Sequence, residues 1–224
     1  IVYDDTYNDR KIRSLLLDKN SSSAMYLDTD DPTDLVYEYS KYYSLYKIFQ
    51  PEIKNTLVLG GGSYTLPKVF LKEFPKAIVD VSEIEPSLFD ISKKYFNVSK
   101  NKRMNNYTED GRRLLSGSDK KYDLIFGDAY LSLFSVPPHF VSREFFSMAK
   151  DHLNKNGLFM ANIIGCLSYE KPSFVFSEIR TFKSVFPNSY FFAVDSPKTK
   201  DLQNIIFVGY KSNEIIDIHS DDIT

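Results

Sequence analysis

The feature that most constrains the fold of this chain is the alternation of short apolar runs with amphipathic helical segments from residue 55 onward. Strands that alternate with helices favour right-handed crossovers and a largely parallel sheet covered on both faces. Most of the runs are largely apolar, which is typical of strands buried on both sides. We therefore predict a doubly wound α/β domain. Its five predicted parallel strands cover residues 56–59, 77–82, 104–107, 122–127 and 158–164.

The last third of the chain predicts a different strand arrangement. A helix near residues 175–186 leads to a strand at 190–194, and a short loop then leads to a strand at 205–210. Two strands this close together pair more easily in antiparallel fashion, because parallel neighbours need a long crossover. Five parallel strands followed by such a hairpin are typical of the seven-stranded methyltransferase-like fold.

Outside this core, the sequence predicts a small β region, a helix and a polar tail. Residues 1–32 contain short β-like stretches broken by polar turns, and residues 33–212 carry the Rossmann-like domain. That domain begins with a predicted helix that Thr33 or Asp34 caps and Pro51 ends. Residues 213–224 are polar and acidic, which predicts a frayed tail.

Composition excludes several classes of function. The 224 residues suffice for one substantial core, and a formal net charge of −2 provides no positive field for nucleic acid. A single cysteine rules out an intrachain disulfide, and no Cys/His cluster has zinc-site spacing, so we expect no metal. No apolar run is long enough to cross a bilayer. We expect a cytoplasmic protein without membrane contact, or the soluble domain of a longer parent chain.

Two polar turns at strand ends point to a nucleoside. Gly60-Gly61-Gly62 follows the first parallel strand and precedes a helix, where glycines let a ligand approach the backbone. Glu83 follows the second strand at the spacing at which an acid accepts hydrogen bonds from ribose hydroxyls. Glu85 is the neighbouring candidate for that role, and a solvated surface carboxylate is the alternative reading of either residue.

Two further acidic turns belong to the same predicted edge of the sheet. Asp110-Gly111 follows the third strand, where the carboxylate can accept a bond from an adenine amino group or cap the next helix. Asp128 ends the fourth strand, at the edge where open α/β folds bind ligands. The glycine turn carries neither a Walker lysine nor any other basic residue, so the predicted ligand is a nucleoside and not a polyphosphate.

These motifs together resemble the spermidine synthase-like family in its prokaryotic branch. The resemblance is carried by the segments Leu57-Val58-Leu59-Gly60-Gly61-Gly62, Ser82-Glu83-Ile84-Glu85-Pro86, Glu109-Asp110-Gly111-Arg112, Tyr122-Asp123-Leu124-Ile125, Asp128-Ala129-Tyr130, Pro137-Pro138-His139-Phe140 and Arg143-Glu144-Phe145-Phe146.

The resemblance implies an aminopropyltransferase that uses decarboxylated S-adenosylmethionine as donor and a polyamine as small-molecule acceptor. It implies a homodimer and makes Asp128 the acid–base residue, Glu83 the ribose ligand and Asp110 the adenine ligand. It assigns the donor site to Gly60, Gly61, Gly62, Glu83, Ile84, Asp110 and Gly111, and the amine site to Tyr37, Asp128 and Tyr130.

Departures from the family pattern keep two alternatives open. Ser63 stands where the family has an acid that holds the amine end of the donor, and Leu131 stands where it has a second acid. Glu38 and Ser22 replace a histidine and a glutamine of the amine site. The alternatives are methyl transfer from S-adenosylmethionine and a non-catalytic nucleoside-binding domain. His139 and the tyrosines around Tyr39 are interpreted as structural.

Overall fold

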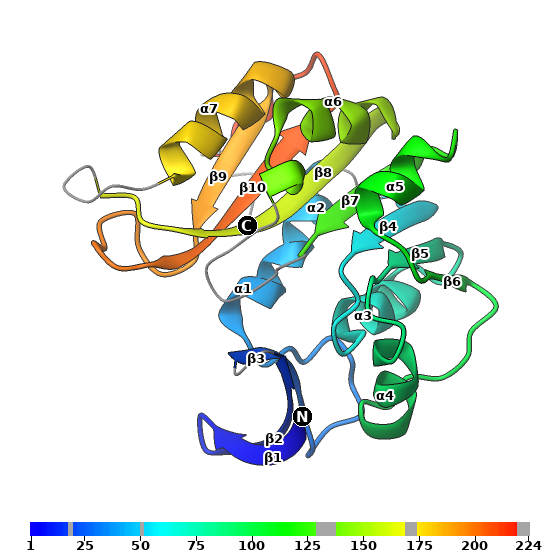
Figure 1. The fold of residues 1–224 in the computed structure, drawn as a ribbon. Helices are drawn as coiled ribbons and strands as arrows, with labels where there is room; N and C mark the ends of the chain where they lie inside the picture. The colour runs from blue at the N-terminus through cyan, green and yellow to red at the C-terminus, as the bar shows by residue number, and fades with distance from the viewer. Residues whose placement is uncertain (18–19, 50–51, 129–137, 169–173, 219–224) are drawn as a thin grey trace.

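The computed structural model describes residues 1–17, 20–49, 52–128, 138–168 and 174–218, which form two sheets (Figure 1). The smaller sheet is antiparallel, with the order β1-β2-β3. Its strands are β1 (Val2–Tyr7), β2 (Arg10–Leu17) and β3 (Asn20–Tyr26). This sheet corresponds to the predicted N-terminal β region, whereas the domain boundaries at residues 32 and 212 stay predictions.

The larger sheet has seven strands in the order β6-β5-β4-β7-β8-β10-β9. Strands β6, β5, β4, β7 and β8 pair in parallel, and β10 runs antiparallel to both β8 and β9. The predicted seven-stranded methyltransferase-like sheet is therefore confirmed. The strands are β4 (Asn55–Leu59), β5 (Ile78–Ser82), β6 (Met104–Tyr107), β7 (Tyr122–Gly127), β8 (Leu153–Gly165), β9 (Ser189–Ala193) and β10 (Gln203–Tyr210).

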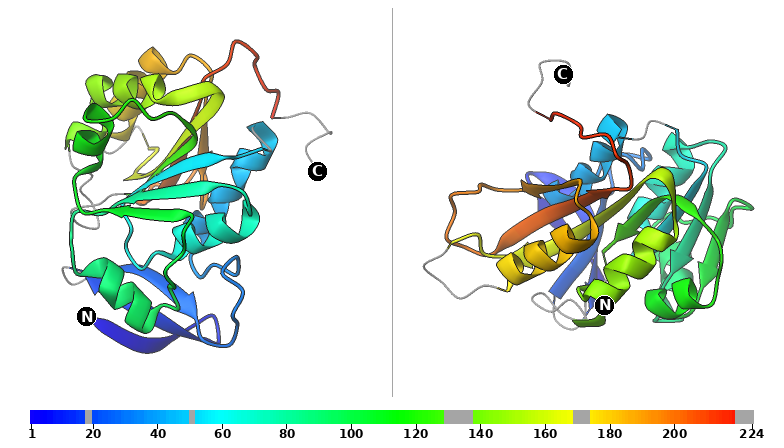
Figure 2. Two further views of the ribbon diagram at one scale, coloured as in Figure 1. Left: turned by 90° about the vertical axis from the view of Figure 1, so that its right-hand side faces the viewer. Right: turned by 90° about the horizontal axis from the view of Figure 1, so that it is seen from above.

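Helices cover both faces of this sheet (Figures 1 and 2). Side chains of β4 explain why its sequence is continuously apolar: Val58 joins the core cluster on one face, and Leu57 and Leu59 join the cluster on the other. One face is covered by α1 (Glu38–Lys41), a 3₁₀ turn (Tyr42–Leu45), α2 (Tyr46–Phe49), α3 (Thr65–Glu73) and α4 (Leu88–Tyr95), and the other by α5 (Gly111–Ser116), α6 (Arg143–Asp151) and α7 (Val175–Val185).

The prediction of one helix capped by Thr33 or Asp34 is wrong. Both side chains are engaged elsewhere: the Thr33 hydroxyl donates to Asp31, and the Asp34 carboxylate accepts from Arg10 at 2.8 Å. Helical structure begins only at Glu38 and continues as two single-turn helices joined by a 3₁₀ turn.

Several contacts tie the small sheet to the larger domain. Ser23 Oγ in β3 accepts a hydrogen bond from the Ser63 backbone N–H at 3.1 Å, and Arg13 donates to the Tyr95 carbonyl at the end of α4. Lys72 of α3 forms an ion pair with Asp31 at 2.7 Å. Within the described residues, no helix has the length and hydropathy needed to span a membrane.

Candidate active site

The four polar turns singled out from the sequence follow β4, β5, β6 and β7 (Figure 1). The carboxyl ends of parallel strands lie at one edge of a sheet, so these turns are neighbours in space although they are far apart in the sequence. Gly60–Gly62 follows β4, Glu83 follows β5, Asp110 precedes α5, and Asp128 follows β7.

The glycine turn after β4 depends on glycine at more than one position. Gly60 has φ of 94° and Gly62 has φ of 51°, which is the left-handed region that favours glycine. A Cβ on Gly61 would lie 2.7 Å from the ring of Tyr64, closer than real Cβ atoms approach. All three glycines therefore have a local structural reason, and a ligand is not needed to explain them.

Glu83 faces this turn. Its Oε2 accepts hydrogen bonds from the backbone N–H groups of Gly61 at 2.8 Å and Gly62 at 3.2 Å, and its Oε1 accepts from the Glu85 N–H at 2.9 Å. A carboxylate offers about four lone-pair sites, so Glu83 keeps acceptor capacity after these three bonds. Next to it, the Ile84 side chain is 69% exposed at the end of β5.

Asp110 caps α5 and also contacts a histidine. Its Oδ1 accepts from the backbone N–H groups of Arg112 at 2.9 Å and Arg113 at 3.1 Å. Its Oδ2 lies 3.1 Å from His139 Nε2. Gly111, the first helical residue, is packed so closely that a Cβ there would lie 2.5 Å from Leu59 Cδ2.

Asp128 is held by two neutral side chains. Its Oδ1 accepts a hydrogen bond from Asn162 Nδ2 of β8 at 3.1 Å, and Tyr39 of α1 hydrogen-bonds to the same carboxyl group. Burial raises the pKa of Asp128 to about 6, and the bonds from Asn162 and Tyr39 act in the opposite direction. The carboxyl group is therefore set to change its protonation state near neutral pH, which suits a proton acceptor.

Tyr37 contacts Tyr39, the tyrosine that hydrogen-bonds to Asp128. Its ring stacks on that of Tyr39 with centroids 6.2 Å apart, and Tyr7 of the small sheet meets it edge-on at 5.8 Å. The predicted amine-site residue Tyr130, and Leu131 with it, lie outside the described residues.

Sequence reasoning missed three residues of this edge. Asn162 carries a signal that could have found it, because it is the one amide in the otherwise apolar run of residues 158–164. Tyr39 follows the apolar pattern of its segment, and no spacing distinguishes it from the core tyrosines. His139 was interpreted as a loop residue, and only the fold brings it to Asp110.

Ser63, which directly follows the three glycines of the turn, has no carboxylate. It is buried, and its hydroxyl lies 2.6 Å from the Thr65 hydroxyl. The side chain at this position is therefore neutral and bonded within the protein. In the described part of the chain, no group of three His, Cys, Asp or Glu side chains is arranged to hold a metal ion.

Comparisons with known proteins agree with the fold and the motifs. A probable polyamine aminopropyl transferase of Bifidobacterium longum is 32% identical over 145 residues, which are 65% of this chain and 32% of that protein. The eEF1A lysine and N-terminal methyltransferase of Homo sapiens is 31% identical over 119 residues, which are 48% of this chain and 17% of that protein. The chain thus spans about a third or less of the length of these two relatives.

This chain is also similar to a solved structure and matches a family model. The crystal structure of a probable spermidine synthase from Corynebacterium glutamicum superposes with a TM-score of 0.83 at 21% identity, covering 99% of this chain and 80% of that one. The profile described as the spermine/spermidine synthase domain matches residues 43–219. The match includes every part of the larger sheet, and the chain belongs to the spermine/spermidine synthase family.

Proposed function

We propose that this chain transfers an aminopropyl group from decarboxylated S-adenosylmethionine to a polyamine acceptor. The observation that carries the proposal is the position of Asp128: a carboxyl group with a raised pKa lies at the same sheet edge as the glycine turn and Glu83. Membership of the spermine/spermidine synthase family supports the reaction class.

The residues at the ends of β4, β5 and β6 suit the nucleoside half of such a donor. Glu83 keeps acceptor capacity beside the glycine turn, so its carboxylate can accept hydrogen bonds from the two ribose hydroxyls. Asp110 Oδ2 takes no part in the helix cap, and beside its contact with His139 it keeps acceptor capacity for an adenine amino group. The exposed Ile84 side chain provides an apolar contact for the base. Close packing of Gly111 against Leu59 brings the start of α5 close to the end of β4.

Asp128 would act on the amine half. An alkyl ammonium with a pKa near 10.4 must lose a proton to attack, which costs about 4–5 kcal/mol at pH 7. Asp128 accepts that proton while the free nitrogen lone pair attacks the carbon next to the sulfonium. The N–C bond forms as the C–S bond breaks, and the sulfur keeps the electron pair in the departing methylthioadenosine. Tyr37 and Tyr39 supply aromatic faces of the kind that attract cations.

Product analysis tests this proposal. The chain is incubated with decarboxylated S-adenosylmethionine and putrescine, and methylthioadenosine is quantified by liquid chromatography and mass spectrometry. We expect product from the native chain and a rate reduced about 100-fold or more in Asp128→Asn, because a general base contributes at least this much. Asp151→Asn, an exposed acid at the end of α6, is the matched control and keeps the native rate. Full turnover in Asp128→Asn would remove Asp128 from the mechanism.

A second candidate function is methyl transfer from S-adenosylmethionine. It is favoured by Ser63, whose hydroxyl bonds Thr65 and offers no carboxylate to the amine end of a decarboxylated donor. The similarity to the human methyltransferase supports the same candidate. In the same assay with S-adenosylmethionine as donor, this reaction releases S-adenosylhomocysteine. If neither product forms and methylthioadenosine still binds, the third alternative remains, a non-catalytic nucleoside-binding domain.

A further inference from the structure

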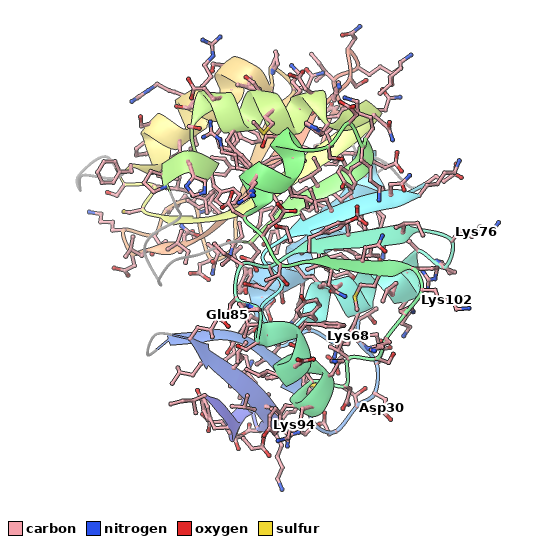
Figure 3. The ribbon with its side chains drawn as sticks, turned by 45° about the vertical axis from the view of Figure 1, so that its right-hand side comes forward. Asp30, Lys68, Lys76, Glu85, Lys94 and Lys102 are labelled. Atoms are coloured by element: carbon pink, nitrogen blue, oxygen red, sulfur yellow. The ribbon has the colours of Figure 1, made fainter. Side chains whose placement is uncertain are left out.

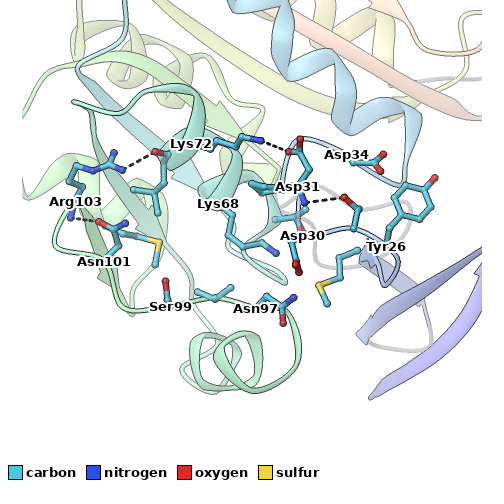
Figure 4. Close-up of a pocket in the computed structure, with 17 residues that line it drawn as sticks. Tyr26, Asp30, Asp31, Asp34, Lys68, Lys72, Asn97, Ser99, Asn101 and Arg103 are labelled. Carbon is cyan, nitrogen blue, oxygen red and sulfur yellow. Dashed lines mark hydrogen bonds and ion pairs between the residues drawn. The ribbon is translucent and has the colours of Figure 1, made fainter.

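A cavity of about 290 Å³ lies beside helix α3 (Figure 4). Three segments form its walls: the end of β3 with the linker that follows it, helix α3, and residues 97–104 between α4 and β6. None of the residues proposed for the donor or the amine lines it. Its size is near the lower end of the ~300–1,000 Å³ typical of small-molecule sites.

Lys68 of α3 points its ammonium group into this cavity (Figure 4). Among the described residues, the acceptor for Lys68 Nζ is the carbonyl oxygen of Phe96, at 2.7 Å. Burial lowers the pKa of Lys68 to about 8, so its positive charge is poorly solvated. An ammonium group has three donors, and an anionic oxygen in the cavity would pair with the remaining ones.

Most other charged groups in the cavity wall already have partners. Lys72 pairs with Asp31 at 2.7 Å, and Asp34 pairs with Arg10 at 2.8 Å. Arg103 donates to three backbone carbonyls near the end of α3 and the start of β5. These bonds and ion pairs hold the wall together.

Asp30 differs from these groups, because it makes no hydrogen bond or ion pair within the part of the chain that the structure describes. Asn97, in the left-handed region with φ of 54°, and Ser99 add uncharged polar groups from the opposite wall. Lys68 and Asp30 are therefore the ammonium and the carboxylate of the wall that lack an ion-pair partner among the described residues. The remainder of the lining includes the apolar side chains of Met25, Leu71, Val98 and Met104.

We propose that this cavity binds a small zwitterion, an α-amino acid with an aliphatic or thioether side chain. The ligand carboxylate contacts Lys68 Nζ, the ligand ammonium contacts Asp30, and the side chain packs on the apolar wall. An anion without a positive group would be repelled by the Asp30 carboxylate. An amine without a negative group would be repelled by the Lys68 ammonium, which has no ion-pair partner among the described residues. A ligand that carries both charges is complementary to both groups.

Calorimetric titration of the whole chain tests the proposal. The probes are L-methionine, 4-(methylthio)butyrate, which lacks the ammonium, and 3-(methylthio)propylamine, which lacks the carboxylate. We expect L-methionine to bind at one site and each single-charge analogue to bind about tenfold more weakly or worse, since each loses one charge-assisted hydrogen bond. Equal affinity of either analogue and L-methionine, or no saturable binding of L-methionine, overturns the proposal.

Variants locate the site. Lys68→Met and Asp30→Asn should each weaken L-methionine binding about tenfold, whereas Lys102→Met, which replaces an exposed lysine of the neighbouring loop, should leave it unchanged (Figure 3). Asp30 is exposed, so its variant keeps the fold even if Lys68→Met does not. Native affinity in Asp30→Asn contradicts the proposal. Excess methylthioadenosine should not compete with L-methionine, and competition would place the amino acid in the proposed active site instead.

Discussion

At the scale of single residues, each carboxylate of the sheet edge is held by its own set of donors. Glu83 accepts from three backbone N–H groups, whereas Asp110 accepts from two and from His139. Asp128 is held by the side chains of Asn162 and Tyr39. The first two carboxylates are thus fixed in position by the backbone, whereas the third is half-buried and its desolvation favours the protonated form.

Asp128 should make stability depend on pH. Its folded-state pKa of about 6 lies above the value near 3.9 of an unfolded chain, so its stabilising contribution is complete below pH 4 and is lost as pH rises through 6. Asp128→Asn removes the buried charge. We expect the variant to be more stable than the native chain by about 1–2 kcal/mol at pH 8, with a smaller difference at pH 4. Urea unfolding at both pH values measures this, and a variant less stable than the native chain at pH 8 contradicts it.

His139 should influence nucleoside affinity through Asp110. The imidazole contacts Asp110 Oδ2 and helps to fix the direction of the carboxylate. Replacing it by alanine removes one hydrogen bond, and we expect methylthioadenosine to bind about 3–10-fold more weakly. His139→Gln keeps a donor and should lose less. Identical dissociation constants for the native chain and His139→Ala would show that Asp110 is positioned by the helix cap alone.

At the scale of elements, the start of α5 is fixed by close packing. Gly111 is closely packed: a Cβ would lie 2.5 Å from Leu59 Cδ2 and 3.4 Å from the ring of Phe140, so the buried Leu59 side chain would have to move. We expect Gly111→Ala to lower the free energy of unfolding by about 1–3 kcal/mol. Gly117→Ala, at the other end of the same helix, is the control, since its nearest contacts are 3.4 Å and 4.0 Å away. Equal effects of the two changes would refute the packing argument.

The elements that sequence could predict are those that depend on local pattern. The central parallel strands follow from largely apolar runs such as that of β4, and the antiparallel pairing of β9 with β10 follows from a loop too short for a crossover. The late start of helical structure at Glu38 could not be predicted, because Asp34 is bound by Arg10, which lies far from it in the sequence at the start of β2. The same holds for the site: turns at strand ends are visible in the sequence, but the approach of His139 to Asp110 depends on long-range packing.

At the scale of the whole molecule, the small sheet supports the glycine turn. Ser23 of β3 provides the acceptor for the buried backbone N–H of Ser63. We expect Ser23→Ala to cost about 1–3 kcal/mol of stability, because this N–H loses its partner. Ser184→Ala on the exposed face of α7 is the control and should change the unfolding free energy little. An unchanged free energy of unfolding in Ser23→Ala would mean that the two sheets dock without this bond.

The homodimer and the cytoplasmic location stay predictions from the family resemblance and the composition. Light scattering of the purified chain tests the first of these.

The most direct test of the account is calorimetric titration with methylthioadenosine of the native chain, Glu83→Gln and Glu85→Gln. We predict one saturable site and about tenfold weaker binding in Glu83→Gln, because the ribose loses a charged acceptor. Glu85→Gln should keep the native affinity, because the Glu85 carboxylate is bonded to Ser87. Absence of binding to the native chain, or equal affinity of the native chain and Glu83→Gln, would contradict it.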